Sequence, residues 1–532
     1  MYSSYTTLQR AQLAKQEYLD TQGVFLGVYA PGRSAALKAS LQDQLHRKFL
    51  LTDSLHPEAL GSAAGVLLVR EDLSLMPTAL SCFADALRSG ADYVTSDAVF
   101  GYSGVTTLYH SQGFAACPGC ALVSRELLLR CRAEARDPEN PVELLTLAAK
   151  LSRSHVCLPL ALAHYERDIC AEDVWSVKGK RVFIMSHLLD MTGAPIVLVS
   201  AVPVLRGMGY EVVVLGPEDG GSMPLFLEAG ATVITRKGCV QSPLLWGLAL
   251  CADLVLANTV VEARAVRALS GARVPVLWWL HDAFAGYPHI AHQIPRELGE
   301  NIRLYSVGSH AANAMHSVRP EFNIRPLIYG LPDYAAEKFS HYDLSYAGGR
   351  PLFATVGSFE NRKGQDIFCK AIRLLPPETM KKASFLFVGK AAEAEMMDAV
   401  RSLTADCPDN VFYVKRLTRD EIKSLMAQCT CLVCASRDDP MPTFVTEGLI
   451  FGKPAIVSEH TGTAGLITEG VDGFVYEDDD PEKLAERLAW AIEHPEKLAA
   501  MRPACRELYE SHYSKQAFSD SLQQAVKELT GE

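Results

Sequence analysis

The chain has 532 residues, of which 48% are hydrophobic and 21% charged, and its formal net charge is −11. A chain of this length is too long for one hydrophobic core, so we expect several domains. The acidic balance argues against a protein that coats nucleic acid, and no apolar run reaches the roughly 18 residues that a membrane span needs. The N-terminus is polar and lacks an apolar signal core, so we predict a cytoplasmic protein; contact with the inner face of a membrane stays open.

The first segment, residues 1–175, shows short apolar strand candidates around one helix candidate. The strands are "GVFLGVYA", "KFLLTD", "GVLLVRE" and "DYVTSD", and the helix is "PTALSCFADALRSG". The pattern is α/β in character, but the segment is too short for a complete doubly wound enzyme domain.

The 14 cysteines of the chain are scattered and mostly sit in apolar segments. This is typical of small core residues in a reducing compartment. The sequence "CPGC" at Cys117–Cys120 has turn residues between its cysteines, but a zinc site needs a second ligand pair, and none is evident. We therefore expect no metal there.

Residues 178–335 alternate apolar strands with helical stretches, which indicates a parallel α/β sheet. One helix is predicted over "APIVLVSAVPVLRGMG", with a glycine at its end. The predicted strands are "RVFIMSH", "YEVVVLG", "ATVIT", "DLVLANT", "VPVLWWLH" and "IRLYSVGS".

A second unit of the same kind covers residues 349–515, after a connecting stretch that contains a Gly-Gly pair. Its predicted strands are "PLFATVGS", "SFLFVGK", "NVFYVKR", "TCLVCAS" and "KPAIVSE". The fold class that we expect is therefore α/β, with two doubly wound Rossmann-like domains after a small α/β domain. Ligands bind such sheets at the carboxyl ends of the strands, so we expect a cleft between the two domains.

The stretch "RDDPMPTFVTEGLIFGKP" at Arg437–Pro454 combines a loop, a helix start and two acidic residues. Pro442 suits the first helical position, which leaves the N–H groups of Thr443 and Phe444 as an anion site. Asp439 lies in the loop, and Glu447 lies inside the helix on the predicted cleft side. The stretch alone is compatible with a ligand clamp and with a capped core helix.

The wider context resembles a known family. The motifs "VGSFENRKGQD", "FLFVGK", "VFYVKRLTRDEI", "LVCASRDDPMPTFVTEGLIFGKPAIVS" and "GVDGFVYEDDDPEKLAERL" occur in this order. They are similar to the nucleotide-sugar half of retaining glycosyltransferases of family 4, which have the GT-B fold. In that family two acidic residues are separated by seven others, and Asp439 and Glu447 match their places. The resemblance covers most of the chain from Lys178 onward.

The resemblance implies roles for residues at the donor diphosphate and the donor sugar. Lys363, in "NRKGQD", corresponds to the lysine that holds the diphosphate, and we take Arg362 as a second cation because Ser358 replaces the family's arginine. The amides of Thr443 and Phe444 complete the diphosphate site. Further residues follow from the same comparison: Gly193 in the loop that borders phosphate and acceptor, His281 and Asp439 at the sugar, Glu447 at the ribose, and Gly389, Arg416 and Leu417 at the nucleobase.

The first segment resembles a piece of a family 2 glycosyltransferase with the GT-A fold. In that family an Asp-rich strand end holds a divalent metal, and here the place reads Arg70-Glu71-Asp72, with Asp97 at a further acidic stretch. Metal binding through oxygen ligands needs several convergent carboxylates. We expect a degenerate GT-A-like domain that serves packing, acceptor binding or assembly, and the alternative is an active second transferase.

The resemblance as a whole implies a retaining hexosyltransferase of surface polysaccharide or glycoconjugate synthesis of the bacterial type. The donor would be a UDP- or GDP-sugar, and the acceptor a glycan or a lipid-linked glycan. No cofactor, no metal at this site and no nucleic acid are expected, and a homo-oligomer or a partner transferase stays open. The closing helix, residues 516–532, is expected to cross back to the domain of residues 178–335. The alternatives are a sugar-nucleotide-binding scaffold that supports a partner transferase and a sugar-nucleotide epimerase of the same fold.

Overall fold

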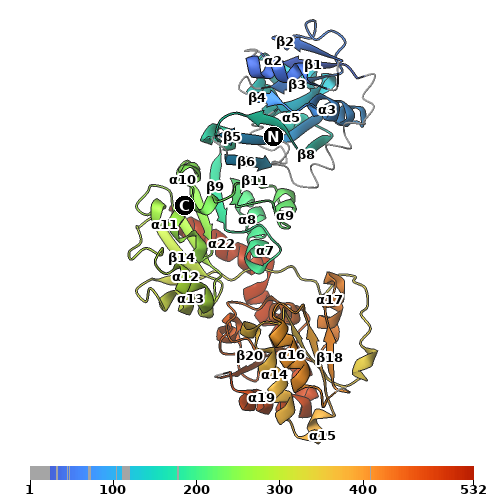
Figure 1. The fold of residues 1–532 in the computed structure, drawn as a ribbon, viewed down its shortest axis with the longest axis vertical. Helices are drawn as coiled ribbons and strands as arrows, with labels where there is room; N and C mark the ends of the chain where they lie inside the picture. The colour runs from blue at the N-terminus through green and yellow to red at the C-terminus, as the bar shows by residue number, and fades with distance from the viewer. Residues whose placement is uncertain are drawn as a thin grey trace. The chain divides into compact units, whose positions relative to one another are not determined.

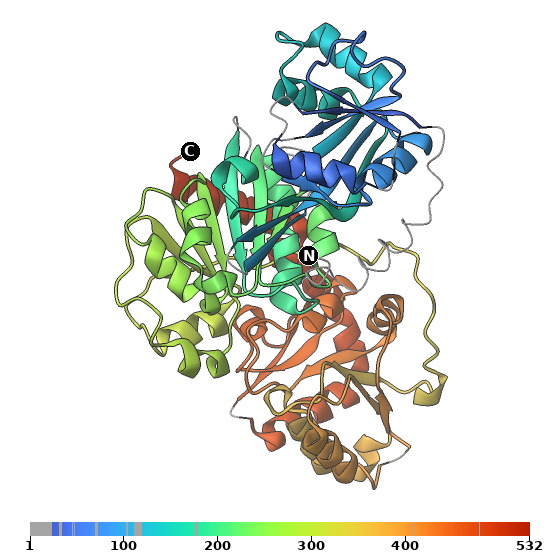
Figure 2. The same cartoon turned by 45° about the horizontal axis from the view of Figure 1, so that its top comes forward.

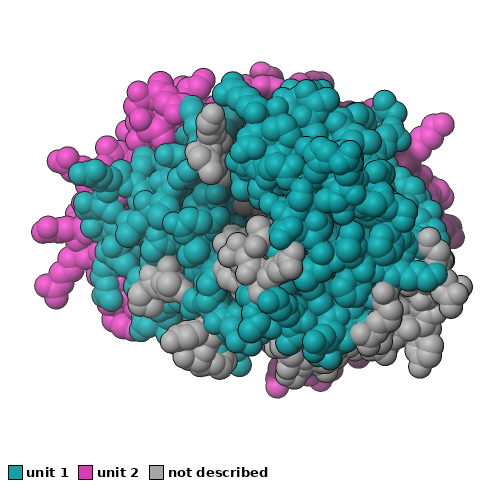
Figure 3. Space-filling model, turned by 90° about the horizontal axis from the view of Figure 1, so that it is seen from above, with its two compact units in different colours: residues 1–257, 264–276 teal, residues 258–263, 277–532 magenta. Residues whose placement is uncertain are grey.

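A computed structural model of the chain describes residues 24–30, 34–44, 46, 48–69, 73–102, 105–110, 120–175, 179–407, 409–477 and 479–532. It contains two compact units, which Figure 3 colours separately: residues 1–257 with 264–276, and residues 258–263 with 277–532. The predicted division into four segments stays a prediction. Arg70, Glu71 and Asp72, the place of the metal site in the family 2 resemblance, lie outside the described residues. Of the "CPGC" motif, Cys117 also lies outside them, whereas Cys120 is buried in a strand.

The first segment of unit 1 is a sheet with helices against it (Figure 2). Five strands are hydrogen-bonded in the order β2-β1-β3-β7-β5, and β8 pairs with β5 and β4. The sheet is mixed, because β7 runs antiparallel to both of its neighbours. Its resemblance to a GT-A domain stays a prediction. The elements are β1 (Leu26–Tyr29), α2 (Ala35–Gln42), β2 (Phe49–Thr52), β3 (Gly65–Val69), β4 (Leu73–Leu75), α3 (Ala79–Arg88), β5 (Tyr93–Tyr102), β7 (Cys120–Ser124), α4 (Arg125–Glu134), α5 (Pro141–Leu151), β8 (His155–Tyr165) and α6 (Ala171–Val174).

The sheet continues from this segment into the next part of unit 1. Strand β6 (Val105–His110) pairs antiparallel with β5 on one side and with β11 (Thr232–Thr235) on the other. From β11 the order continues through β10 (Tyr210–Gly216) and β9 (Lys180–Ser186), which are parallel, to β12 (Leu254–Asn258). The helices here include α9 (Met223–Glu228), α10 (Pro243–Ala249) and α11 (Ala263–Leu269).

A buried histidine joins the two parts of this sheet. His110 Nδ1 lies 2.7 Å from Asp97 Oδ2, and His110 Nε2 lies 3.1 Å from Asp219 Oδ1. Thr235 donates to the same Asp219 oxygen at 2.7 Å. Burial by itself lowers the pKa of His110, but the charges and hydrogen bonds of the two carboxylates outweigh it and raise the pKa to about 10. At neutral pH the ring is therefore a buried cation between two acids.

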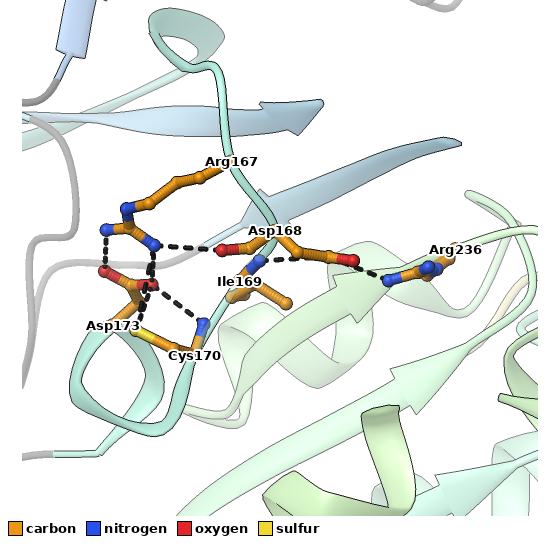
Figure 4. A network of polar contacts seen from close by, with 6 residues as sticks. All are labelled: Arg167, Asp168, Ile169, Cys170, Asp173 and Arg236. Atoms are coloured by element: carbon orange, nitrogen blue, oxygen red, sulfur yellow. Dashed lines mark hydrogen bonds and ion pairs between the residues drawn. The ribbon is translucent and has the colours of Figure 1, made fainter. Parts of the chain in front are cut away.

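A second polar network lies after β8 (Figure 4). Arg167 forms a two-point ion pair with Asp173, with N–O distances of 2.6 and 2.8 Å. The backbone N–H of Cys170 donates to Asp173 at 2.9 Å, and Arg236 donates to Asp168 at 2.8 Å. Because Arg236 directly follows β11, the turn after β8 is bonded to the end of that strand.

The helix predicted over residues 194–209 is wrong as a single element. The structure has two helices, α7 (Gly193–Val199) and α8 (Ala201–Gly207), which meet at Ser200. Pro203 explains the break, because a proline has no N–H for the carbonyl of Val199 and its ring clashes with that carbonyl.

The six-stranded sheet of unit 2 has the order β18-β17-β16-β19-β20-β21, and all its recorded pairs are parallel. Helices flank it, as the orange and red part of Figure 1 shows. Strands β17, β19 and β20 are buried along their whole length, as expected for a sheet covered on both faces. The strands are β16 (Leu352–Val356), β17 (Ser384–Val388), β18 (Val411–Val414), β19 (Cys431–Cys434), β20 (Ala455–Ser458) and β21 (Gly473–Tyr476). The helices are α14 (Gln365–Leu374), α15 (Pro377–Met380), α16 (Ala394–Leu403), α17 (Arg419–Gln428), α18 (Thr443–Ile450), α19 (Pro481–Glu493), α20 (Pro495–Ala500) and α21 (Arg502–Leu508).

Unit 2 also contains β13 (Val276–Leu280), α12 (Tyr287–Ile290), β14 (Ile302–Ser306), α13 (Ser309–His316) and β15 (Ile324–Pro326). The closing helix α22 (Lys515–Thr530) packs on these elements. Its Phe518 ring stacks on Trp279 with 5.6 Å between ring centres, and the N–H of Leu331 donates to the Tyr513 carbonyl at 2.8 Å. A Cβ on Gly330 would lie 2.8 Å from Phe518, so only glycine allows this approach.

Within the described ranges, no helix has both the length and the apolar character needed to cross a membrane.

Candidate functional site

The topology of the six-stranded sheet sets the place of the candidate site. The strand order reverses between β16 and β19, and open α/β sheets bind ligands at the carboxyl ends of such strands. Lys363 lies in a 3-10 turn after β16, and Asp439 lies in the loop after β19. Their side chains meet, with 2.5 Å between Lys363 Nζ and Asp439 Oδ2. Two residues that the sequence singled out separately are therefore brought together at the switch point.

Close backbone approach at this edge depends on glycine. Gly364 has a φ of +62°, and a Cβ there would lie 1.8 Å from the carbonyl oxygen of Ala435. Gly389 follows β17, and its Cβ would lie 1.8 Å from the Gly357 oxygen. The loops after β16, β17 and β19 are therefore packed against one another without side chains between them.

Arg437 fixes the acidic loop to the start of α14. Its guanidinium donates to both Asp366 oxygens, at 2.9 and 2.8 Å, and its N–H donates to the Arg362 carbonyl at 2.8 Å. Burial alone would raise the pKa of Asp366, but the hydrogen bonds and charge of Arg437 and Lys370 lower it. The carboxylate is therefore charged at neutral pH, and a planar two-point pair of this kind fixes orientation as well as distance.

Asp438 binds residues of the segment that contains β13 and β14. Its carboxylate accepts N–H groups of Phe284 at 3.1 Å and Ala285 at 2.9 Å, and His310 Nε2 lies 2.7 Å from it. Burial raises the pKa of Asp438, but these hydrogen bonds outweigh burial and lower it. The sequence pointed to neither role, because nothing local to His310 or Asp438 marks the other as its partner.

Glu447 lies in α18, more than one turn after the first residue of the helix. Its side chain is 11% exposed, and it pairs with Arg419 at the start of α17. Burial raises the pKa of Glu447, and the charge and hydrogen bond of Arg419 act against this rise. Arg419 was not predicted from the sequence, because nothing local marks a partner 28 residues away.

The start of α18 differs in detail from the prediction. Pro442 precedes the helix as its N-cap, with φ −68° and ψ 107°, and Thr443 is the first helical residue. The extended ψ of Pro442 excludes it from the first helical position. Thr443 and Phe444 still open the helix, so their N–H groups have no acceptor within the helix itself.

His281 directly follows β13, where it was expected. It is partly buried, and its ring lies 4.4 Å from that of Trp279. The next residue, Asp282, accepts the N–H of Val260 at 2.6 Å, and burial raises its pKa to about 6. A buried carboxyl of this kind beside His281 was not singled out from the sequence.

The remaining predicted residues are placed as follows. Gly193 is the first residue of α7 in unit 1, and Arg362 is partly exposed and pairs with Glu360 at 3.0 Å. Arg416 is exposed and Leu417 partly buried in the turn between β18 and α17. A cavity of about 410 Å³ lies beside this turn, with Gly389 and the strand end of β18 in its wall. It is lined by Phe359, Gly389, Ala391, Ala394, Met397, Asp398, Arg401, Tyr413, Val414 and Lys415.

Comparison with solved structures shows the GT-B fold of paired Rossmann-like domains. HepE of Anabaena, solved with UDP and glucose, superposes with a TM-score of 0.53 at 17% identity, over 66% of this chain and 100% of HepE. Sucrose-phosphate synthase of Thermosynechococcus elongatus gives a TM-score of 0.52 at 15% identity, over 66% of this chain and 99% of the synthase. The class of protein is therefore GT-B.

Two family models narrow the class. "Glycosyl-transferase family 4" matches residues 178–313, and "Glycosyl transferases group 1" matches residues 338–508. These two segments belong to glycosyltransferase families, as their motifs suggested. The first segment, residues 1–175, lies outside both matches, and its resemblance to a GT-A domain stays a prediction.

Curated relatives match shorter parts of the chain. An uncharacterized glycosyltransferase of Methanocaldococcus jannaschii is 26% identical over 144 residues, which are 26% of this chain and 38% of the relative. Glycogen synthase of Pseudomonas syringae is 26% identical over 201 residues, which are 37% of this chain and 39% of the synthase. The chain thus spans less than half the length of the curated relatives it matches.

Proposed function

We propose that the protein is a retaining hexosyltransferase that moves a sugar from a nucleotide diphosphate-sugar to a glycan or lipid-linked acceptor. The observation that carries the proposal is the Lys363–Asp439 pair at the switch point, beside the start of α18. A cation and helix amides at one place suit a diphosphate. The structure of the similar protein HepE contains UDP and glucose, which favours UDP over GDP as the nucleotide of the donor.

In this proposal different residues bind the diphosphate, the sugar and the ribose of the donor. Lys363 and the amides of Thr443 and Phe444 stabilise the charge that develops on the leaving diphosphate. Asp439 and His281 orient the sugar, and Glu447 accepts the ribose hydroxyls. The sugar passes through an oxocarbenium-like transition state, and attack on the face that the diphosphate leaves retains the anomeric configuration.

Other parts of the proposal remain predictions. The site operates without a metal, because Lys363 and the start of α18 supply the positive charge that the diphosphate needs. The protein works in the cytoplasm, with or without contact to the inner face of the membrane, in surface polysaccharide or glycoconjugate synthesis. A partner transferase or a homo-oligomer is also compatible with it.

The direct test is turnover by the purified protein. We expect mass spectrometry to detect a glycosylated acceptor with at least one UDP- or GDP-sugar, and nuclear magnetic resonance to find the donor's anomeric configuration in the product. Nucleotide binding without turnover, across many donors and acceptors, would favour the scaffold. A free sugar epimer formed without acceptor would identify an epimerase instead.

Replacing Glu447 with alanine should remove most of the thermal protection that a nucleoside diphosphate gives. A ligand present at about 100 times its Kd stabilises a folded protein by about 2.7 kcal/mol, and loss of a charge-assisted contact lowers this value. Differential scanning fluorimetry with UDP and GDP measures the change. Glu486→Ala, an exposed acid on α19, is the matched control and should keep full protection. Equal protection in both variants would contradict the assignment of Glu447.

A further inference from the structure

An arginine outside the predicted site contacts the carboxylate proposed to hold the ribose. Arg419 Nη1 donates to Glu447 Oε1, and among the described residues it is the one side chain that hydrogen-bonds this carboxylate. Glu447 lies on α18 and Arg419 on α17, and the two helices pack against each other. The Arg419 side chain is 51% exposed, against 11% for Glu447, so the carboxylate is buried while part of the cation reaches solvent.

Tyr334 holds Arg419 in this position. Its hydroxyl accepts a hydrogen bond from Arg419 Nη2 at 2.7 Å, and the guanidinium carbon lies 4.8 Å from its ring centre. Lys423, one turn further along α17, lies 4.9 Å from the same ring centre and 2.5 Å from Glu337. The stretch that precedes the six-stranded sheet is thus bonded to the residue that contacts Glu447.

The stability of α17 does not account for an arginine at this place. Arg419 is the first residue of the helix, where a cation faces the positive end of the helix dipole. The helix start is already capped, because Thr418 and Glu421 form a reciprocal pair of hydrogen bonds. The cation is unfavourable for the helix and favourable for Glu447.

The pairing defines what Glu447 can do. A buried carboxylate tends to take up a proton, and a protonated carboxyl accepts fewer hydrogen bonds than a carboxylate. A partner cation favours the charged form, and a single guanidinium contact to Oε1 leaves acceptor sites on both oxygens for other donors. Paired hydroxyls, such as those at the 2′ and 3′ positions of a ribose, suit those sites.

We propose that Arg419 is a positioning residue that keeps Glu447 charged and oriented for the two ribose hydroxyls of the donor, and that Tyr334 positions Arg419. The inference rests on the proposed function, since it assigns Arg419 to the same donor site. It goes further by separating ribose recognition from binding of the diphosphate: Arg419 acts on the first and Lys363 on the second.

The test measures how much more tightly the protein binds a nucleotide with the 2′ and 3′ hydroxyls of the ribose than one without them. Calorimetry gives the Kd of UDP and of 2′,3′-dideoxy-UDP, and of GDP and its dideoxy counterpart, for each protein. For the wild type we expect a preference of at least about tenfold for the natural nucleotide, as loss of charge-assisted hydrogen bonds implies. Arg419→Gln should reduce the preference to less than about threefold while the dideoxy nucleotide still binds as it does to the wild type.

Three further variants make the result specific. Arg419→Lys keeps the charge and should restore part of the preference. Tyr334→Phe removes only the hydroxyl and should lower the preference by a smaller factor, which decides the case if Arg419→Gln does not fold. Arg373→Gln is the matched control, because Arg373 is also a half-exposed arginine in an ion pair, with Asp406 at 3.3 Å. This variant should prefer the natural nucleotide by the same factor as the wild type.

A preference that is unchanged in both Arg419→Gln and Tyr334→Phe overturns the positioning role and leaves a structural ion pair. Equal weakening of natural and dideoxy nucleotides also overturns it, since a general loss of structure affects both. Failure of the proposed function has a different signature: the wild type itself binds neither UDP nor GDP, and the positioning role then fails with it.

Discussion

The Lys363→Ala variant should lose about 10²- to 10³-fold in transfer rate, because a positioned donor at a developing negative charge has an effect of this size. The lysine lies at the switch point of the sheet and contacts Asp439 at 2.5 Å. Initial rates with saturating donor, measured by release of nucleoside diphosphate, give the comparison. Lys381→Ala, which changes an exposed lysine directly after the end of α15, should keep the wild-type rate.

The stability of this variant needs its own measurement. Removing Lys363 leaves Asp439, which is 6% exposed, without its cation, and an uncompensated buried charge destabilises a protein by about 3–5 kcal/mol. In the double variant Lys363→Ala/Asp439→Asn that charge is gone. We expect its melting temperature to recover and its rate to stay below that of the single variant Asp439→Asn, which lacks the same carboxylate but keeps Lys363. A double variant as fast as Asp439→Asn would show that Lys363 acts on folding alone.

Replacement of His110 by leucine should destabilise unit 1 by about 3–5 kcal/mol, because it leaves two buried carboxylates without their cation. Asp97 and Asp219 both bond to the His110 ring, and the ring connects the strand β6 to the loop after β10. Thermal unfolding followed by circular dichroism measures the loss. His56→Leu changes an exposed histidine of the same unit and should leave the transition in place.

The same histidine predicts how stability depends on pH. The folded state raises the pKa of His110 to about 10 from an ordinary value of 6.5, so the folded protein holds this proton more tightly than the unfolded chain. Its contribution to the free energy of unfolding is complete below pH 6.5 and disappears as the pH rises through 10. The wild type should therefore lose stability over this range, and His110→Leu should lose less. Parallel slopes in the two proteins would refute the buried cation.

The sequence allowed prediction of those features that depend on neighbouring residues in the chain, such as strands and the residues directly after them. The strands from residue 178 onward follow apolar runs with short loops, and the residues after each strand end fall at the carboxyl edge of the sheet. Lys363 and Asp439 could therefore be named as site candidates without knowledge of their contact. The Ser200 break and the place of Pro442 were missed because a pattern of apolar residues does not show whether a proline breaks a helix, precedes it or lies in its first turn.

Side-chain contacts between segments far apart in the chain could not be predicted from the pattern of apolar and polar residues. Arg419 and Glu447, like Asp438 and His310, belong to different elements, and each side chain alone is compatible with a solvated surface charge. His110 was not considered at all, because its strand follows a stretch without clear periodicity. Such pairs depend on which helices and loops pack together, and the packing follows from the whole sheet order.

The contact of α22 with Trp279, Gly330 and Leu331 has a consequence for biosynthesis. Domains fold in the order in which the ribosome makes them, but these three residues obtain their packing partners, Phe518 and Tyr513, only after the six-stranded sheet has been translated. Until then the indole of Trp279 lacks the Phe518 ring, and the carbonyl of Leu331 lacks the Tyr509 hydroxyl that donates to it in the finished protein. The nascent chain therefore carries an incompletely covered strand end between the synthesis of Trp279 and that of Phe518, a stage at which a chaperone would find it.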